Sequence, residues 1–470
     1  MASRRLVRHL SSPSADRSLA MKFGTDGVRG AANTELTADF ALNLGRAAAQ
    51  VLSRLGAGSD DPDSTGGAPR DIVVIGGDTR ESTPMFRAAL AAGFAAEGVD
   101  VIDMVTATTP LVAFEAQRLG VMGAVISASH NPFGDNGIKL FAPGGTKLPD
   151  DVEAQIETAL DVLGDPSNSI GRIGVHHDTT HYVKHVLDML GGRDLSGMKV
   201  VLDTANGAGT TVAPDVLRAS GAEVIVIANE PDGRNINAGC GATHPEFVAA
   251  AVVEHGAHMG VALDGDADRL IAVDHTGSVV DGDHIIAICA ADLRARGQLA
   301  SNTVVVTVMT NLGFRLAMEA AGIHVVETGV GDRYVLEALG AGGYSLGGEQ
   351  SGHVIFADHA TTGDGLLTAV ALIDIVKRTG TTLEAIASQS MTSLPQVLVN
   401  VRVGEQVPDV AVLLADEISI VEAELGATGR VLVRASGTEP LIRVMVEAAT
   451  AERAQTAADQ LAAVAQLRFA

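Results

Sequence analysis

Continuous apolar segments alternate with helical, alanine- and leucine-rich stretches through most of this chain. Three of these segments, at residues 71–80 (DIVVIGGDTR), 199–210 (KVVLDTANGAGT) and 303–314 (TVVVTVMTNLGF), join a run of β-branched residues to a polar turn that contains glycine. Strands that are apolar on both faces and are separated by helices are typical of parallel sheets covered by helices on both sides. The pattern therefore predicts three related α/β domains with mainly parallel sheets.

Residues 391–470 follow a different pattern. Apolar and polar residues alternate at 395–403 and 430–446, which predicts strands, and helical periodicity appears at 409–425 and 451–467. This part is predicted to form a smaller C-terminal α+β domain. Ligands of α/β folds bind beyond the carboxyl ends of the strands, so we expect the functional groups there.

Polar and glycine-rich breaks divide the chain into domains. We predict an α/β domain 1 at 21–177, an α/β domain 2 at 178–277, an α/β domain 3 at 278–390 and the C-terminal domain at 391–470. Residues 1–20 contain several arginines and serines but lack the apolar core of a secretory signal, which predicts a disordered extension with Met21 as a second candidate start. The polar stretch 56–70 is predicted to be a surface loop.

Charge and composition narrow the class of protein. The chain has 33 basic and 57 acidic residues, a formal net charge of −24, and no basic block. We therefore expect neither nucleic acid nor an anionic membrane as a partner. No apolar run reaches the roughly 18 residues that a membrane span needs. The two cysteines, Cys240 and Cys289, are too few for a disulfide framework, which favours a cytoplasmic protein. Neither charge nor composition indicates an oligomeric state.

The first candidate for chemistry is the motif SASHNP at 127–132, which follows an apolar strand-like segment at 122–126. It places the hydroxyl of Ser129 beside the imidazole of His130, and Lys139 follows in a chain that contains few lysines. A nucleophilic serine with a nearby base is the functional interpretation. The structural alternative is a hydrogen-bonded turn before a proline.

The second candidate is DGDADR at 264–269, directly after the apolar segment 259–263. Asp264, Asp266 and Asp268 alternate along the chain, so an extended backbone would point all three carboxylates to one side. Hard oxygen ligands favour Mg²⁺ or Ca²⁺. An EF-hand is excluded because its sixth position would be Arg269 and its twelfth His275. An acidic turn and an aspartyl-phosphate enzyme remain as alternatives.

A third cluster, GGEQSGH at 347–353, precedes a strand-like segment. Its glycines keep the backbone open, while Glu349 and Ser351 offer an acceptor and a donor to neighbouring hydroxyls of a polyol. A glycine-rich hairpin explains the same residues without a ligand.

The fourth cluster is RASGTEP at 434–440, with Arg443 beyond it. Guanidinium groups, hydroxyls and an accessible glycine N–H match the oxygens of a phosphate dianion. The donors would be Arg434, Ser436, Gly437, Thr438 and Arg443. A β-turn with a surface arginine is the structural alternative, and the lack of a Walker lysine argues against a nucleotide loop.

These four motifs, in this order, resemble the signature loops of the α-D-phosphohexomutase superfamily. The resemblance covers essentially the whole chain after Met21. The opening FGTDGVRG at 23–30 and the form GEQSGH are similar to the branch that acts on glucosamine phosphates. The resemblance implies an isomerase that interconverts glucosamine 6-phosphate and glucosamine 1-phosphate through a phosphoserine enzyme and a 1,6-bisphosphate. Such an enzyme supplies UDP-N-acetylglucosamine and cell-wall synthesis.

The resemblance also implies roles for individual residues. Ser129 would carry the phosphoryl group, and one Mg²⁺ would be held by Asp264, Asp266, Asp268 and a phosphate oxygen on Ser129. The sugar 1,6-bisphosphate would serve as intermediate and activator. Arg29 and Arg269 would stabilise charge, and either Lys139 or His130 would act as general acid and base, with Lys139 the first candidate for the base. Glu349 and Ser351 would bind hydroxyls. The phosphate that does not react would be bound by Arg434, Ser436, Gly437, Thr438 and Arg443. The resemblance also implies that the four domains are arranged around a central cleft.

Two other functions fit parts of the pattern. A phosphomannomutase or phosphoglucomutase of the same superfamily would use the same loops, because these loops bind phosphate and hydroxyls more than the substituent at C2. A sugar-phosphate sensor without catalysis is the alternative from a different class. The serine, the three aspartates and Arg269 argue against it, since a binding protein needs no nucleophile beside a metal.

Overall fold

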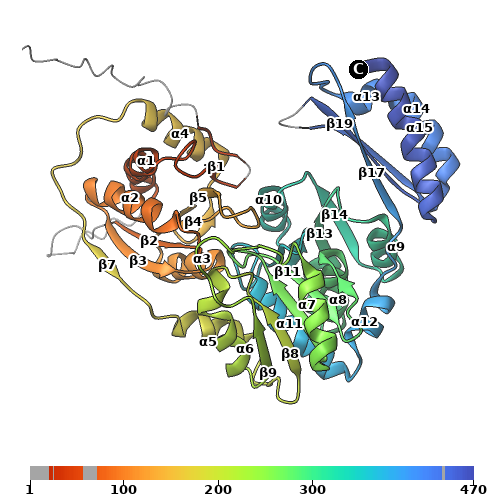
Figure 1. The fold of residues 1–470 in the computed structure, drawn as a ribbon, viewed down its shortest axis with the longest axis horizontal. Coiled ribbons are helices and arrows are strands. Elements are labelled where there is room, and N and C mark those ends of the chain that lie inside the picture. The colour runs from red at the N-terminus through yellow and green to blue at the C-terminus, as the bar shows by residue number, and fades with distance from the viewer. Residues whose placement is uncertain (1–20, 25, 57–70, 437–439, 470) are drawn as a thin grey trace, which may run out of the picture.

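The computed structural model describes residues 21–24, 26–56, 71–436 and 440–469, and the chain folds there into three α/β domains and a C-terminal domain (Figure 1). The predicted extension 1–20, most of the predicted loop 56–70, and the predicted phosphate ligands Gly437 and Thr438 lie outside the described residues. The four domain ranges given above stay predictions. Among the described residues, no helix combines the length and the apolar character needed to cross a membrane.

The first domain contains a seven-stranded sheet in the order β1-β5-β4-β2-β3-β7, with β6 paired to β5. Its elements are β1 (Val28–Ala31), α1 (Ala38–Gly56), β2 (Ile72–Gly77), α2 (Thr83–Ala96), β3 (Asp100–Thr106), α3 (Thr109–Leu119), β4 (Met122–Ile126), β5 (Asp135–Ala142), β6 (Thr146–Lys147), α4 (Asp150–Asp161) and β7 (Ile173–Val175).

The second domain contains a five-stranded sheet in the order β12-β11-β10-β8-β9. Its elements are α5 (Thr180–Asp188), β8 (Lys199–Asp203), α6 (Ala213–Ala219), β9 (Glu223–Ile227), α7 (Pro245–His255), β10 (Met259–Leu263), β11 (Leu270–Asp274) and β12 (Val279–Val280).

The third domain contains a four-stranded sheet in the order β14-β13-β15-β16. Its elements are α8 (Gly282–Ala295), β13 (Thr303–Thr307), α9 (Leu312–Ala320), β14 (His324–Thr328), α10 (Asp332–Gly342), β15 (Leu346–Gly348), β16 (Val354–Phe356), α11 (Gly365–Thr379) and α12 (Leu383–Ser390).

One strand arrangement recurs in all three sheets. Three parallel strands are followed by a fourth, antiparallel strand, in the orders β3-β2-β4-β5, β9-β8-β10-β11 and β14-β13-β15-β16. The prediction of three related α/β domains is confirmed. The sheets are mixed, and not fully parallel, because the third parallel strand of each sheet forms a hairpin with the antiparallel fourth strand.

The C-terminal domain is a three-stranded antiparallel sheet in the order β17-β19-β18, covered by helices. Its elements are β17 (Gln396–Arg402), α13 (Val410–Leu413), α14 (Ala415–Leu425), β18 (Arg430–Ala435), β19 (Leu441–Glu447) and α15 (Ala451–Phe469). The segment predicted as strand at 430–446 is a hairpin, and the helical segment at 409–425 is interrupted at Leu414. Figure 1 shows this domain set apart from the first domain, on the far side of the third.

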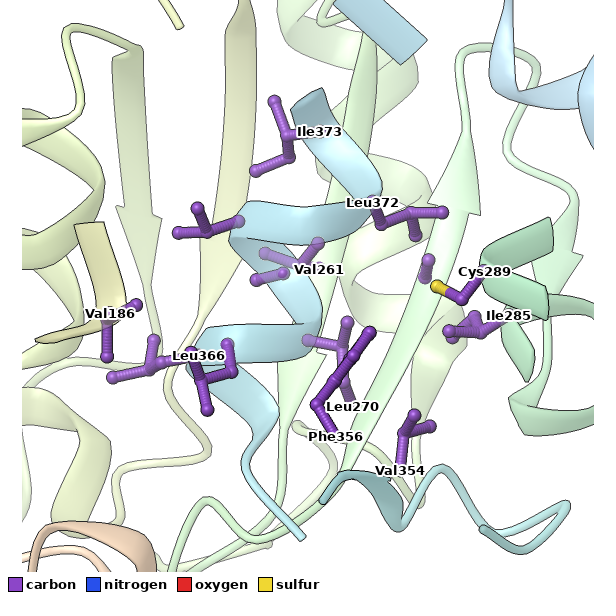
Figure 2. Close-up of a cluster of buried hydrophobic side chains, with 14 of the residues drawn as sticks. Val186, Val261, Leu270, Ile285, Cys289, Val354, Phe356, Leu366, Leu372 and Ile373 are labelled. Carbon is purple, nitrogen blue, oxygen red and sulfur yellow. The ribbon is translucent and has the colours of Figure 1, made fainter. Parts of the chain in front are cut away.

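Helix α11 joins the cores of the second and third domains. Leu366, Leu372 and Ile373 of this helix are fully buried. Figure 2 shows these side chains near Val261 of the second sheet and Cys289 of helix α8. One hydrophobic cluster thus includes residues of the first three domains. Since burial of each such side chain stabilises by about 1.5–3 kcal/mol, these domains are expected to resist separation.

The C-terminal domain is attached to the third domain through polar groups. Asn311, before helix α9, accepts a bond from the Leu394 N–H (2.9 Å) and donates one to the Leu394 carbonyl (3.0 Å). The fully buried Glu447 accepts from the Leu312 N–H (2.9 Å) and pairs with Arg430 (3.0 Å). A carboxylate of one domain therefore caps a helix of the other, which the helix dipole favours.

Asp283 at this junction is expected to make stability depend on pH. Burial raises the pKa of its carboxyl to about 7. The Asn311 N–H, which donates to Asp283 Oδ2 at 2.8 Å, favours the charged form and only partly opposes this rise. The folded protein therefore keeps a proton that the unfolded chain releases near pH 4, so this contribution to stability is present at low pH and is lost as the pH rises towards 7.

We expect the wild type to lose stability relative to Asp283→Asn between about pH 4 and pH 7, by on the order of a few kcal/mol. Thermal unfolding of both proteins across this range measures the difference. A difference in melting temperature that stays constant with pH would contradict the assignment.

Candidate active site

Three predicted loops occupy the same place in the repeated strand arrangement. The serine loop joins β4 to β5, the aspartate loop joins β10 to β11, and the loop with Glu349 and Ser351 joins β15 to β16. Each loop follows the third parallel strand of its sheet, where α/β folds bind ligands. The repeated fold therefore explains why motifs far apart in sequence carry the chemistry.

The structure brings Ser129 against the aspartate loop. Ser129 is buried, and its Oγ donates a hydrogen bond of 2.6 Å to Oδ2 of Asp264. His130 Nδ1 lies 3.3 Å from the same Oγ. The pKa of His130 is lowered to about 4 by burial and by the charges of Arg269 and Arg29, so its imidazole is neutral at pH 7.

The three aspartates converge, but through a turn and not through the extended backbone expected above. Ala267 has a φ of 60°, in the left-handed region, and its N–H bonds to the Asp264 carbonyl. The turn is held from the first domain by Thr109, whose Oγ1 donates to Asp266 Oδ2 at 2.7 Å. The alternation of residues therefore predicted the correct group of carboxylates but the wrong backbone geometry, because the turn is held by Thr109, a residue far away in sequence.

The aspartate loop has the donor set of a metal site. One ligand atom each from Asp264, Asp266 and Asp268 can be chosen so that all lie within 4.8 Å of one another, and all three residues are buried. Oδ1 of Asp266 and Oδ1 of Asp268 are buried without a hydrogen-bond partner. Burial and the neighbouring carboxylates raise the pKa of Asp264 well above its usual range. A cation would relieve both conditions, so the residues fit a metal ion.

Lys139 balances the aspartates. Its Nζ lies 2.9 Å from Asp266, 3.0 Å from Asp268 and 3.0 Å from Asp26. Burial alone would lower the pKa of Lys139, but these carboxylates outweigh it and hold the pKa well above its ordinary value. Burial would likewise raise the pKa of Asp26, yet Lys139, Lys147 and Arg29 hold it well below its usual range. Lys139 is therefore a protonated donor.

A cleft of about 550 Å³ opens beside these groups and is lined by all four domains. Its lining includes the predicted residues Arg29, Arg269, Glu349 and Arg434. The lining residues from the part of the chain that the structure describes are Lys22, Gly24, Asp26, Gly27, Arg29, Asp268, Arg269, Val330, Gly331, Asp332, Glu349, His353 and Arg434. The basic and acidic groups that face this cleft suit a ligand with both anionic and hydroxyl groups.

The loop between β15 and β16 carries three residues of interest, Glu349, Ser351 and His353, and each has a different environment. Glu349 lines the cleft, and its Oε1 accepts a bond of 3.1 Å from the Gly331 N–H. Ser351 Oγ is buried without a hydrogen-bond partner. His353, to which the sequence gave no role, places Nδ1 3.7 Å from Asp268 and accepts from the Gly363 N–H at 3.1 Å. This histidine links the loop to the aspartates.

Two of the predicted phosphate ligands lie side by side on the C-terminal sheet. Arg434 of β18 is directly opposite Arg443 of β19 in the strand register. Burial and the charge of Arg443 lower the pKa of Arg434. Ser436, whose N–H bonds to the Leu441 carbonyl, lies at the end of β18. Like charges placed opposite each other are unfavourable without a counterion, so the pair is set to bind an anion.

Gly265 of the aspartate loop packs closely against the backbone of Ser129. A Cβ atom at this position would lie 2.5 Å from the Ser129 carbonyl oxygen, a backbone atom that cannot move independently. We expect Gly265→Ala to displace Ser129 and to lower kcat by about 10²-fold, because misplacement by about 1 Å costs this much. Gly134→Ala, whose Cβ would meet nothing within 4 Å, is the matched control. Steady-state kinetics that are equal for the two variants would contradict this contact.

Several residues of the site were missed from sequence. Two of them are Asp26 and Lys147: Lys147 lies 3.6 Å from Asp26 and 2.5 Å from Asp332 of the third domain. Arg80 and Asn237 hold the serine loop. Asp26 and Arg80 do stand in short polar motifs, TDGVRG and GGDTR. Nothing local identifies their partners, which lie far away in sequence.

Four family models match successive parts of the chain. They are described as phosphoglucomutase/phosphomannomutase alpha/beta/alpha domains I, II and III and the C-terminal domain, and they match residues 20–164, 180–277, 281–394 and 398–464.

Three similar bacterial proteins share the name phosphoglucosamine mutase. Phosphoglucosamine mutases of Frankia casuarinae and Nocardioides sp. are each 53% identical, covering 94% and 95% of this chain and 97% and 99% of the relatives. That of Streptomyces avermitilis is 52% identical over 94% of this chain and 97% of the relative.

Solved structures share the fold at lower identity. A phosphoglucomutase/phosphomannomutase family protein of Burkholderia thailandensis has a TM-score of 0.78 and 24% identity, over 96% of this chain and 98% of the other. An N-acetylphosphoglucosamine mutase of Aspergillus fumigatus, solved with GlcNAc-6P and magnesium, has a TM-score of 0.67 and 17% identity, over 98% of this chain and 100% of the other. With models of all four domains matched in order, and relatives about half identical over nearly their whole length, the chain belongs to the phosphoglucomutase/phosphomannomutase family.

Proposed function

We propose that this protein is a phosphoglucosamine mutase, an isomerase that interconverts glucosamine 6-phosphate and glucosamine 1-phosphate. The relatives that are about half identical over nearly the whole chain are phosphoglucosamine mutases. The observation that carries the mechanism is the 2.6 Å hydrogen bond from Ser129 Oγ to Asp264, which places a buried hydroxyl beside three carboxylates. The two unpaired, buried cysteines support a cytoplasmic location.

In the first step the phosphoryl group moves from Ser129 Oγ to the O1 hydroxyl of glucosamine 6-phosphate. The P–Oγ bond breaks, a P–O1 bond forms, and the hydroxyl gives up its proton. Asp264, Asp266 and Asp268 would hold one Mg²⁺, which offsets the phosphoryl charge and stabilises the charge of the transferring oxygens. The guanidinium of Arg269, which lines the cleft next to Asp268, adds positive charge there.

Two side chains are suited to move the proton. His130 is neutral at pH 7 and lies 3.3 Å from Ser129 Oγ, so it is able to accept a proton. Lys139 is protonated among its three carboxylates and is able to donate one. The roles exchange in the reverse direction, and general acid–base help of this kind contributes about 10²–10⁴-fold.

The 1,6-bisphosphate then presents its other end to the serine. The O6 phosphoryl group moves to Ser129 Oγ, the P–O6 bond breaks, and glucosamine 1-phosphate leaves. In both orientations Arg434, Ser436 and Arg443 would hold the phosphate that is not reacting, as would Gly437 and Thr438. Glu349 and Ser351 would bind the hydroxyls in the middle of the ring, whose positions change least on reorientation.

An assay coupled to glucosamine 1-phosphate formation tests this proposal. We expect activity that requires Mg²⁺ and a catalytic amount of a sugar 1,6-bisphosphate, with kcat/KM for glucosamine 6-phosphate above that for glucose or mannose 6-phosphate. A higher kcat/KM for glucose or mannose phosphates would instead support a phosphoglucomutase or phosphomannomutase.

A further inference from the structure

We propose that Arg80 and Asn237 are positioning residues that hold the backbone of the serine loop, so that Ser129 Oγ faces the aspartates throughout the reaction. This inference rests on the proposed function and adds to it two residues that belong to neither the metal loop nor the phosphate site.

The backbone of Ser129 needs such support. Its φ is 51°, in the left-handed region, which a residue with a Cβ seldom adopts. A conformation of this kind persists only where the surroundings fix it. In this conformation Ser129 Oγ bonds to Asp264, and the Ser129 carbonyl accepts hydrogen bonds from two side chains, Arg80 and Asn237.

Arg80, which follows the carboxyl end of β2, supplies one of these donors and also binds other carbonyls of the loop. The residue is 1% exposed, and its Nη2 donates to the carbonyls of Ser129 (2.9 Å) and Asn131 (2.8 Å). Its Nη1 donates to the carbonyls of Pro132 and Asp135. One planar guanidinium therefore binds four carbonyls of the serine loop, an arrangement that a lysine cannot reproduce.

The guanidinium itself is fixed from behind. Arg80 Nε lies 2.8 Å from Asp78 Oδ2, and both side chains are fully buried. Ser127 Oγ donates to the same Asp78 oxygen at 2.7 Å and accepts from the Ser129 N–H at 2.9 Å. The loop is thereby bound on both its N–H and its carbonyl side by one network.

Asn237 ties this network to the second domain. Its Nδ2 donates to the carbonyls of Ser129 (2.9 Å) and Asn131 (3.2 Å), two of the acceptors that Arg80 also uses. The residue is buried, and the opposite orientation of the amide would place Oδ1 against these carbonyls. Because the aspartates belong to the second domain, Asn237 links the serine loop to the body that carries its partners.

Asn237→Gly removes the amide without adding strain, since Asn237 has a φ of 57° and glycine adopts this conformation readily. Asn235→Ala in the same loop is the matched control. Among the described residues, its side chain bonds to the Asp232 N–H and to the Glu230 carbonyl, and to no residue of the serine loop.

We expect Asn237→Gly to lower kcat about 10- to 100-fold with KM for glucosamine 6-phosphate changed less than about threefold, because the sugar and phosphate sites lie on other domains. Asn235→Ala should keep both constants. A merely structural role would lower the melting temperature of Asn237→Gly and leave kcat of the folded enzyme unchanged, which would overturn the inference. Arg80→Lys should show the same split between kcat and KM.

Hydrogen exchange supplies a readout that does not depend on activity. Amides of residues 127–136 should exchange faster in Asn237→Gly than in Asn235→Ala. Equal exchange in the two variants would overturn the inference even if the wild type had another substrate. An inactive wild type with faster exchange in Asn237→Gly would instead count against the proposed function alone.

Discussion

Ser129→Ala is expected to abolish mutase turnover, with a loss of at least about 10⁴-fold in kcat, because no other group then receives the phosphoryl group. The fold should survive, since the change removes one hydroxyl and its bond to Asp264 and leaves the backbone contacts of the loop in place. Steady-state kinetics and thermal unfolding measure the two effects.

Intact-mass analysis makes this prediction specific to one serine. The wild type should carry one phosphoryl group after incubation with a sugar 1,6-bisphosphate, and Ser129→Ala should carry none. Ser127→Ala, two residues away, should still be phosphorylated, because its hydroxyl bonds to Asp78 and the variant keeps Ser129 Oγ, which bonds to Asp264. A phosphoryl group that persists in Ser129→Ala would refute the serine as its carrier.

Asp266→Asn is expected to raise the Mg²⁺ concentration needed for half-maximal activity by at least about 10- to 100-fold. Mutation of a residue that only hydrogen-bonds to a metal ligand already lowers metal affinity by this factor, and Asp266 is itself a proposed ligand. Asparagine keeps the shape of the side chain but loses the charge next to the partnerless Oδ1. Removing Mg²⁺ with a chelator should stop the wild type in the same assay.

The control for this variant is Asp188→Asn, at an exposed ion pair with Lys184 on helix α5. Its metal dependence should equal that of the wild type. Direct Mn²⁺ binding, followed by the paramagnetic signal of the ion, separates metal affinity from catalysis. An unchanged affinity in Asp266→Asn would place the metal elsewhere.

The sequence predicted those parts of the fold and site that depend on short stretches of chain. The segments at 122–126 and 259–263 are strands with those bounds because their apolar runs end abruptly at polar loops. The sequence singled out Ser129 and the three aspartates because each motif is contiguous, and the structure brings these residues together. The hairpin break within 430–446 was missed, since alternation continues on both sides of the turn.

The rest of the site depends on contacts between distant residues. In the sequence, Arg80 is a polar residue at the end of a predicted strand. Its role depends on its contact with the serine loop, which lies about fifty residues further along the chain. The guanidinium of Arg333, on helix α10, pairs at 2.7 Å with Glu153 of helix α4, in another domain. Which way such a side chain turns is decided by domain packing, which no local pattern records.

The three chemical loops of the α/β domains each close a hairpin, so both ends of every loop are anchored to hydrogen-bonded neighbours within one sheet. Their freedom to adjust is correspondingly small. The arginine pair of the last domain is joined to the rest mainly through one connecting segment and the polar contacts of Asn311 and Glu447. Since this domain also has a hydrophobic core of its own, we expect any reorientation of a bound intermediate to be accommodated by movement of this domain and not by the three loops.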